Sequence, residues 1–264
     1  MKYYTIPSPP ALKDIVRFFW VLESNEPYTH YSMADVCPEM VFHYNGRFDE
    51  LLHNGDITPS FTAGIHGQTN FTRRFHIDDS FGIFGTYLYP HAIPLLFNIP
   101  APELTNQMTD LQLLLQAAGS ELEEKIWNAR STAQRVKIME SFILQRLAKH
   151  YKAEPPVFQC IQSIIHSKGL VTIKQLASDH FLSERQFERK FRQFSGFSPK
   201  LFSRIVRFQS TMAQYGNKEK SLTEIALECG YYDQSHFIHE FREFSGNHPR
   251  HYFSGDSDAT KWRD

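Results

Sequence analysis

The sequence predicts an α+β fold in two parts, a β-rich amino-terminal region with helices after it, then an all-helical carboxy-terminal region. Two observations support this prediction. Up to about residue 100, short runs of β-branched and aromatic residues alternate with glycine-containing turns, and beyond residues 99–102 the apolar residues recur at helical intervals. Near the carboxy terminus one pattern of residues occurs twice, which indicates a duplicated helical unit.

The composition is that of an ordinary globular protein. With 264 residues, 41% of them hydrophobic and 22% charged, the chain is long enough for two domains, each with its own core. It has no apolar run of membrane-spanning length and its first residues lack a signal-peptide core, so we expect a cytoplasmic protein without a membrane partner. The three cysteines, Cys37, Cys160 and Cys229, lie far apart, which argues against a disulfide framework or a zinc site, and no cofactor is expected.

Short strands are expected from the amino terminus to about residue 100. Asn45-Gly46 is a strong signal for a hairpin turn, and glycines flank or interrupt the later runs. This spacing predicts a small β-barrel or sandwich. The runs that carry the prediction are Leu12 to Val21, Met40 to Tyr44, Phe61 to Ile65 and Phe81 to Tyr89.

Residues 103–150 are expected to form two or three helices, because apolar residues such as Leu111, Leu115, Ile126 and Met139 recur there at helical spacing. The amino-terminal domain is therefore assigned to residues 1–150. Residues 151–156, YKAEPP, have the composition of a linker. We assign the helical domain to residues 157–254 and a polar tail to residues 255–264.

In the helical domain, helix start and stop signals follow one another closely. A first helix begins at Val157 and ends at Lys168-Gly169, and Pro199 starts a longer helix that we expect to end near Tyr215-Gly216. The four expected N-caps of the remaining helices are Thr172, Ser183, Ser221 and Asp233.

The repeated pattern is an N-capping residue, Phe four and eight positions later, and then Phe-Ser-Gly-x-x-Pro. Seven residues in the same register are hard to attribute to composition alone. The first copy is Ser183, Phe187, Phe191, Phe194, Ser195, Gly196 and Pro199, and the second is Asp233, Phe237, Phe241, Phe244, Ser245, Gly246 and Pro249.

A short helix, a tight turn and a second helix make a helix-turn-helix arrangement. Ala177 and Ala226 are small where the two helices of each unit would cross, and the phenylalanines would hold the second helix on the core. The opposite face would then enter a major groove, where Arg reads guanine, Gln reads adenine and the other residues bind phosphate. The candidate DNA-binding residues are Arg185, Gln186, Glu188, Arg189 and Arg192 in the first unit, and Ser235, His236, His239 and Arg242 in the second.

Charge supports this assignment in the first unit. Residues 183–207 hold seven Lys and Arg against two Asp and Glu, although the whole chain has a net charge of -1. A solvated helix face and a protein-binding pair of helices are the competing interpretations. Duplication, basic bias and side chains suited to a groove together favour DNA.

Residues 157–253 resemble the DNA-binding domain of the AraC/XylS family of bacterial transcription regulators, through Ile225-Ala226, Gly230-Tyr231, Asp233 to Phe237, Phe241-Arg242, Gly246 and Pro249. The resemblance implies seven helices, two helix-turn-helix units joined by the helix from Pro199, and recognition helices in successive major grooves of promoter DNA. It also implies an activator whose second unit contacts RNA polymerase. By position, Arg185, Gln186, Glu188 and Arg189 match the base-reading residues of the family. His236 and His239 form a second set that lacks a central Arg, which suggests backbone or water-mediated contact.

The amino-terminal region resembles the sensor domain of a subset of this family, through Pro10-x-Leu12-x-x-x-Val16-x-x-x-Trp20, Pro38-Glu39, and Phe84-Gly85 followed by Pro90. The resemblance implies a cupin-like domain that senses a small-molecule effector or mediates dimerisation. The helices of residues 103–150 are a candidate homodimer interface, with packing against the barrel as the other interpretation. The candidate ligand-binding residues are Glu39, His66 and Arg74.

A metal-dependent cupin-type enzyme fused to a DNA-binding module is the alternative function, because cupins often hold metals and this region is rich in histidine. No two of these histidines have HxH spacing and no downstream Glu completes a ligand set, which favours structural or surface roles. We therefore expect a sequence-specific DNA-binding regulator and no enzyme. The histidines concerned are His30, His43, His53, His66, His76 and His91.

Overall fold

The structure, a computed structural model, describes residues 1–52, 54–150, 156–217, 219–255, 257 and 260. Except for Pro156, the predicted linker lies outside these residues, as do His53 and most of the predicted tail. The chain forms two compact units. The first comprises residues 1–30, 37–68 and 73–153, and the second comprises residues 31–36, 69–72 and 154–264.

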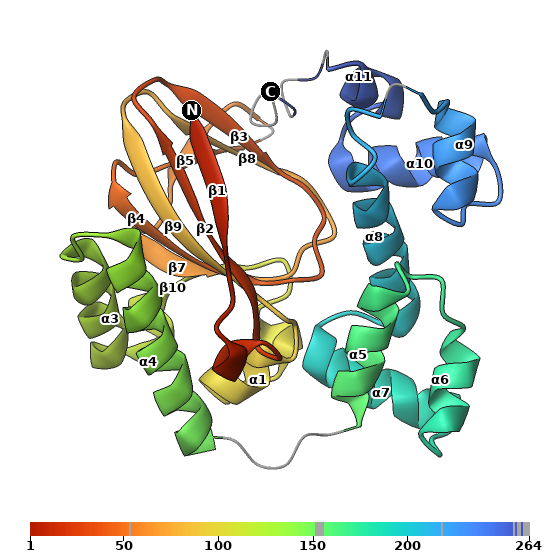
Figure 1. Cartoon of the computed structure of the whole chain (residues 1–264), viewed down its shortest axis with the longest axis horizontal. Coiled ribbons are helices and arrows are strands. Elements are labelled where there is room, and N and C mark those ends of the chain that lie inside the picture. Colours follow the sequence, from red (N-terminus) through yellow and green to blue (C-terminus); the bar gives the residue numbers. More distant parts are fainter. Residues whose placement is uncertain (53, 151–155, 218, 256, 258–259, 261–264) are drawn as a thin grey trace. The chain divides into compact units, whose positions relative to one another are not determined.

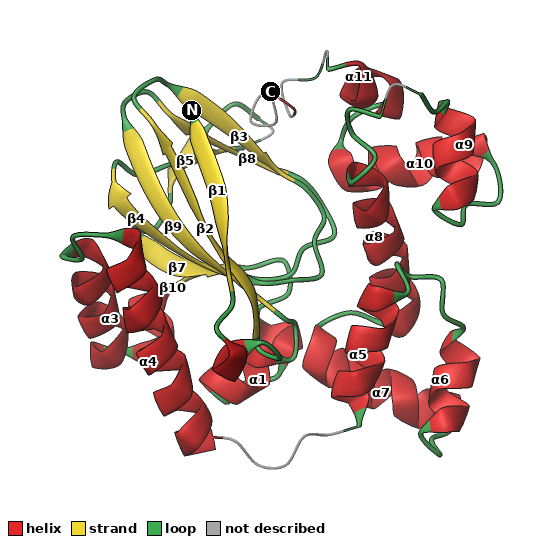
Figure 2. Cartoon of the chain, viewed as in Figure 1, coloured by secondary structure: helices red, strands yellow, loops and turns green. Residues whose placement is uncertain are grey.

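The strands of the amino-terminal region form two sheets (Figures 1 and 2). The larger sheet is antiparallel, in the order β1 (Lys2–Pro7), β2 (Val16–Ser24), β9 (Phe81–Leu88), β4 (Glu39–Asn45), β7 (Ala63–His66) and β10 (Met108–Asp110). The smaller sheet has the order β3 (Tyr28–Ser32), β8 (Arg73–Ile77), β5 (Asp49–Leu51) and β6 (Ile57–Pro59). Two short 3-10 helices, Pro10–Leu12 and Ala101–Glu103, lie between strands.

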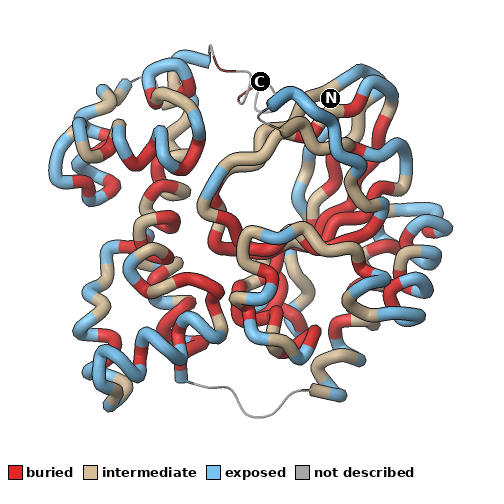
Figure 3. The backbone as a smooth tube through the Cα atoms, turned by 180° about the vertical axis from the view of Figure 1, so that it is seen from behind, coloured by how far each residue is buried: buried red, intermediate tan, exposed pale blue. Residues whose placement is uncertain are grey.

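The two sheets pack face to face over an aromatic core, which gives a sandwich, one of the two forms that the sequence predicted; neither sheet closes into the barrel that was the other. Buried stretches run through this region (Figure 3), and β9, at the centre of the larger sheet, is buried along its whole length. Trp20 lies so close over Gly85 that a Cβ at Gly85 would be 1.9 Å from the indole ring, so only glycine fits there. The buried core residues are Leu22, Val41, Phe48, Phe75, Ile77, Phe81 and Ile83.

Three features of this region differ from the sequence prediction. Residues 92–97, expected within the β-rich segment, form the helix α1 (Ala92–Phe97), whose apolar side chains are buried without alternation. β10 lies inside the segment expected to be helical and pairs with β7. Asn45-Gly46 does turn the chain, with Gly46 at φ 62°, but β4 before it and β5 after it belong to different sheets, so no hairpin forms.

The remaining helices of the first unit follow β10, as expected. They are α2 (Leu111–Leu115), α3 (Ala117–Trp127) and α4 (Thr132–His150). α3 packs against β4 and α4, and α4 packs against α1. Leu122 and Ile126 on α3, and Met139 and Ile143 on α4, supply the buried faces of these helices.

Four histidines of the amino-terminal region are buried or half-buried as neutral rings. Burial lowers the pKa of His30, His43 and His91 to about 4 and that of His66 to about 3. His91 Nε2 lies 2.7 Å from the carbonyl oxygen of Asp14, and His66 packs between the rings of Phe61 and Phe75. These histidines therefore favour the folded state only while they are uncharged.

The second unit contains seven helices within its described residues, as the resemblance implies. α8 ends three residues before the position expected from the sequence, and Figure 1 shows it between the two groups of shorter helices. The helices are α5 (Val157–His166), α6 (Ile173–Asp179), α7 (Glu184–Ser195), α8 (Pro199–Met212), α9 (Leu222–Glu228), α10 (Gln234–Ser245) and α11 (Pro249–Ser254).

One helix, α8, holds both repeated helices through phenylalanine contacts. The ring of Phe202 meets that of Phe191 on α7 with centroids 5.2 Å apart. Six residues later, about 9 Å along the helix axis, the ring of Phe208 meets Phe241 at 5.3 Å and Phe244 at 5.6 Å. All five rings are almost completely buried, so the spacing of Phe202 and Phe208 sets the spacing of α7 and α10.

The other repeated residues end one helix and start the next. Gly196 and Gly246 follow α7 and α10 in the left-handed conformation, with φ of 83° and 67°. The buried Ser195 hydroxyl donates to the carbonyl of Phe197, and Ser245 makes the corresponding bond to Asn247. The two prolines stand in the first turn of α8 and α11, where a missing N–H costs nothing.

Phe208→Ala is expected to lower the free energy of unfolding by about 3–5 kcal/mol, because it opens a cavity between α8 and α10. Urea unfolding followed by circular dichroism measures this change. Leu227→Ala, on the exposed part of α9, is the matched control and should change stability by less than about 0.5 kcal/mol. Equal effects of the two substitutions would contradict the role given to Phe208.

Acidification from pH 6.5 towards pH 4 is expected to destabilise the sandwich. In the unfolded state histidines such as His43 and His91 have their ordinary pKa of 6.5 and take up protons in this window. In the folded state their pKa is about 4 and they do not, so the free energy of unfolding falls as the pH falls. Each such histidine contributes up to about 1.4 kcal/mol per pH unit. Urea titrations at a series of pH values, followed by tryptophan fluorescence, measure the slope; stability independent of pH between 6.5 and 5 would contradict this expectation.

Candidate nucleic-acid interface

The first recognition helix, α7, begins at a reciprocal cap. The N–H of Gln186 donates to the hydroxyl of Ser183, and the N–H of Ser183 donates to the side-chain oxygen of Gln186, each at 3.3 Å. Phe187 and Phe191 bury the inner face of the helix. The cap and the two phenylalanines together fix where α7 starts and which face it exposes.

The outer face of α7 is exposed and cationic. Arg185 and Arg189 stand two positions before and after Phe187, so they point away from the core, and Arg192 lies on the same side. No ion pair among the described residues involves these three arginines. Three exposed guanidinium groups are thus available to an external anion.

The remaining two predicted residues of α7 differ in availability. Glu188 is exposed beside the arginines. Gln186 is exposed as well, but its side-chain oxygen is engaged in the cap, which leaves its NH₂ group for an outside acceptor. The capping role of Gln186 follows the Ser-x-x-Gln spacing and could have been foreseen from it.

The second recognition helix, α10, is capped by Asp233, whose carboxylate accepts from the N–H of His236 at 2.7 Å. Ser235, His239 and Arg242 are exposed on it, as expected. His236 is half-buried, and its Nε2 lies 3.3 Å from a carboxylate oxygen of Glu240. His236 is therefore turned partly towards the protein.

Glu240 is the centre of a charge network that the sequence did not reveal. It is 3% exposed and accepts a hydrogen bond from Nε of Arg204 on α8 at 2.6 Å, while another nitrogen of Arg204 bonds Glu243 at 2.6 Å. The corresponding residue of the first unit, Lys190, is exposed. At equivalent positions of the repeat, α10 therefore has a buried carboxylate and α7 has an exposed ammonium group.

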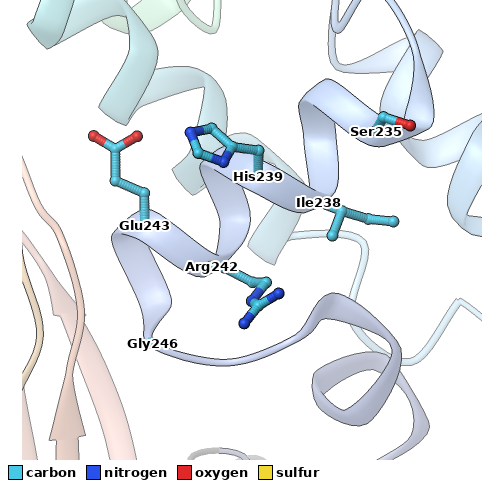
Figure 4. A pocket seen from close by; sticks show the side chains of 6 residues that line it. All are labelled: Ser235, Ile238, His239, Arg242, Glu243 and Gly246. Atoms are coloured by element: carbon cyan, nitrogen blue, oxygen red, sulfur yellow. The ribbon is translucent and has the colours of Figure 1, made fainter.

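An open depression of about 580 Å³ lies along α10 and is lined by its side chains (Figure 4). The side chains drawn in Figure 4 carry both signs of charge, from Arg242 and Glu243, in contrast to the cationic face of α7. The residues that line it are Ser235, Ile238, His239, Arg242, Glu243 and Gly246.

Two of the three candidate ligand residues of the sandwich are brought together. Glu39 on β4 is directly opposite His66 on β7 in the strand register. Arg74 follows Arg73 on β8, and alternation places Arg74 on the face away from the buried Phe75. Arg74 donates instead to the carbonyl of Leu52 at 3.4 Å.

Sequence reasoning missed two residues that lie nearer the interior. Arg73 shares the face of Phe75 and pairs with Glu50 at 2.6 Å. Nδ1 of His30 and Nε2 of His66 are buried and lack a hydrogen-bond partner among the described residues. The alternation of Arg73, Phe75 and Ile77 would have identified Arg73; nothing in the sequence distinguished His30 from the other histidines.

In the described part of the chain, no three His, Cys, Asp or Glu side chains gather as a metal site would need. Nor does that part contain a helix with the length and apolarity to cross a membrane.

Two family matches divide the chain. A family described as a domain of unknown function (DUF6597) matches residues 4–110, and a helix-turn-helix domain family matches residues 176–255. The second match spans α7 and α10 with their caps and turns. The first spans the strands of both sheets, from Tyr4 within β1 to Asp110 at the end of β10.

Curated relatives match part of this chain. An uncharacterized HTH-type transcriptional regulator of Haemophilus influenzae is 36% identical over 80 residues, 30% of this chain and 27% of the relative. The HTH-type transcriptional activator RhaS of Escherichia coli is 27% identical over 140 residues, 53% of this chain and 42% of the relative. The chain thus aligns with less than half the length of either relative.

The fold resembles that of ToxT from Vibrio cholerae, with a TM-score of 0.50 and 11% sequence identity over 96% of this chain and 98% of ToxT. This similarity concerns the fold alone. Residues 176–255, with their paired, N-capped helices on α8, thus form a helix-turn-helix domain of the AraC/XylS type.

Proposed function

We propose that this chain is a transcription regulator that binds double-stranded promoter DNA in a sequence-specific manner through residues 157–254. Residues 1–150 sense a small molecule or bring two copies together. The observation that carries the proposal is the outer face of α7, where Arg185, Arg189 and Arg192 are exposed and form no ion pair with another described residue. The names of the curated relatives, which are transcriptional regulators, support it.

α7 is the main base reader in this proposal. Arg185 and Arg189 lie in the first half of the helix, the part that a helix-turn-helix protein places against base edges. A guanidinium group can bond O6 and N7 of guanine, and Glu188 can accept from cytosine N4. Arg192, farther along the helix, suits a phosphate.

α10 has the weaker, positional role. Arg242 and His239 are available for phosphate or water-mediated contacts, while His236 is engaged with Glu240. RNA polymerase is the second macromolecular partner in this proposal, contacted through the second unit, and activation is the proposed sign of regulation. The name of the E. coli relative, a transcriptional activator, supports that sign.

The sandwich offers a polar group of side chains next to aromatic rings. The ring of His66 stacks on that of Phe75. Nε2 of His66 and Nδ1 of His30 have no hydrogen-bond partner among the described residues, so both can bond a ligand that the sandwich encloses. The Arg73–Glu50 pair adds charges of both signs. We therefore propose a small effector that has both an apolar ring and hydrogen-bonding groups.

The helices of residues 103–150 are the proposed dimer interface. Leu113 on α2, Trp127 on α3 and Leu144 on α4 are exposed by 81%, 53% and 41%. Large apolar side chains at the surface suit contact with another protein. Two protomers would present two copies of α7 to two half-sites, which raises specificity.

Arg189→Ala is expected to weaken binding to a duplex selected from a random-sequence pool by roughly 1–3 kcal/mol and to relax the preference at one base pair. Titrations with the selected duplex and its single-base variants measure both effects. Lys190→Ala is the matched control: it removes one neighbouring exposed charge and should weaken binding to all duplexes equally. An equal loss on all duplexes for Arg189→Ala would contradict base reading by this residue.

Ligand sensing is tested by thermal melting in the presence of a panel of small aromatic acids and alcohols. We expect at least one compound to raise the melting temperature of the wild-type protein, because a ligand bound to the folded state stabilises it by mass action. His66→Phe should abolish the shift, and His166→Phe, at an exposed position on α5, should retain it. A compound that stabilises all three proteins equally would place its site elsewhere.

A further inference from the structure

The turn between α6 and α7 is closed by two hydrogen bonds. The N–H of Phe181 donates to the carbonyl of Ser178 at 3.0 Å, and the N–H of Leu182 donates to the carbonyl of Ala177 at 3.0 Å. This pair of bonds is the Schellman motif, in which the residue after the helix cap takes the left-handed conformation and is usually glycine. Here that residue is Phe181, with φ of 54°.

The turn between α9 and α10 has the same two bonds. Gly230 donates to Leu227 at 3.0 Å and Tyr231 to Ala226 at 2.9 Å, and Gly230 has φ of 78°. The duplication thus supplies an internal comparison. At one structural position the second unit has the residue that the backbone prefers, and the first unit has Phe181, whose Cβ is strained there.

Packing does not explain Phe181. The residue is 97% exposed, more than any other large hydrophobic residue in the described part of the chain. A single exposed apolar side chain is ordinary. At Phe181 the backbone is also strained, and the exposed side chain makes no packing contribution that would offset this strain. Strain retained without a structural benefit points to a role outside the fold.

Phe181 lies two residues before Ser183, the N-cap of α7. In a helix-turn-helix protein the amino-terminal end of the recognition helix approaches the base edges. We propose that Phe181 contacts DNA at that end of α7 and recognises a thymine through its 5-methyl group. This proposal rests on the proposed function, DNA binding through α7.

The chemistry of the ring selects the thymine. A phenyl group makes no ordinary hydrogen bond to a base edge, and the apolar group that the major groove presents is the methyl group of thymine. The nearby exposed charges, Arg185 and Arg189, favour a polyanion over an uncharged protein surface. Phe181 would therefore add one base preference to those read by the arginines.

Uracil substitution tests the contact directly, because uracil in DNA lacks only the methyl group. The probe is a duplex selected from a random-sequence pool, with each thymine replaced singly. One replacement is expected to weaken binding of the wild-type protein about fourfold, the effect of one methyl group in an apolar contact. The same replacement should not change binding of Phe181→Gly, which should bind the thymine duplex less tightly than wild type.

Two further variants separate the contact from folding. Phe181→Gly relieves the backbone strain, so its melting temperature should be no lower than that of the wild type, and a loss of affinity cannot then be ascribed to unfolding. Phe181→Ala keeps the strain, lacks the ring and should also lose the response to uracil. Tyr3→Ala, which removes an exposed aromatic residue on β1, outside the proposed DNA-binding and dimer surfaces, should retain the wild-type response.

Equal responses of the wild type and Phe181→Gly to every uracil replacement would overturn the thymine contact and leave DNA binding intact. If Phe181→Gly bound all duplexes like the wild type and lost only transcription from a promoter reporter, Phe181 would contact a protein, and the proposal would be wrong. If the wild-type protein selected no duplex, the proposed function would fail, and this inference with it.

Discussion

The helical unit depends on the contacts of two phenylalanines of α8. Phe202 packs on α7 and Phe208 packs on α10, and because both belong to one rigid helix, the distance between the two repeated helices is set by the helical rise. The caps at Ser183 and Asp233 then decide where each recognition helix begins. Gln186 takes part in the cap, but the outward-facing charged residues of α7 form no ion pair among the described residues, whereas His236 and Glu243 on α10 are paired. The buried contacts of α8 thus fix the positions of α7 and α10, while the outward-facing residues of α7 can be replaced without changing those contacts.

The two copies use one frame with different charges. Lys190 is solvated, whereas Glu240, at the same place in the repeat, is buried and bonded to Arg204. A buried carboxylate needs such a partner, since an unpaired charge away from water is costly. His236 and Glu243 belong to the same network, so the positive charge of Arg204 is neutralised by carboxylates of the protein itself. α7 keeps its positive charge at the surface, which is the physical basis for the unequal roles proposed for the two helices.

Local signals in the sequence predicted the helical unit well, because a cap, a Schellman turn or a proline at a helix start acts within a few residues. Ser183, Gly196 and Pro199 all have the roles expected of them. The sandwich was predicted only in outline. Whether β5 pairs across Asn45-Gly46 or joins the other sheet depends on distant partners, as does the three-residue strand β10. Which of Arg73 and Arg74 faces the interior of the sandwich follows from strand alternation, which can be read from the sequence. The burial of Glu240 could not be predicted in this way, because it depends on Arg204, 36 residues away.

The network around Arg204 also bears on how this protein can change. Arg185, Arg189 and Arg192 face outward from α7 and form no ion pair among the described residues, so under the proposed function new DNA preferences can arise there one substitution at a time with little loss of stability. On α10, a change at His236 or Glu240 disturbs a buried charge and must be accompanied by a change at Arg204. Divergence among descendants of this chain should therefore accumulate at different rates in the two copies, fast in the first and slow, by linked replacements, in the second.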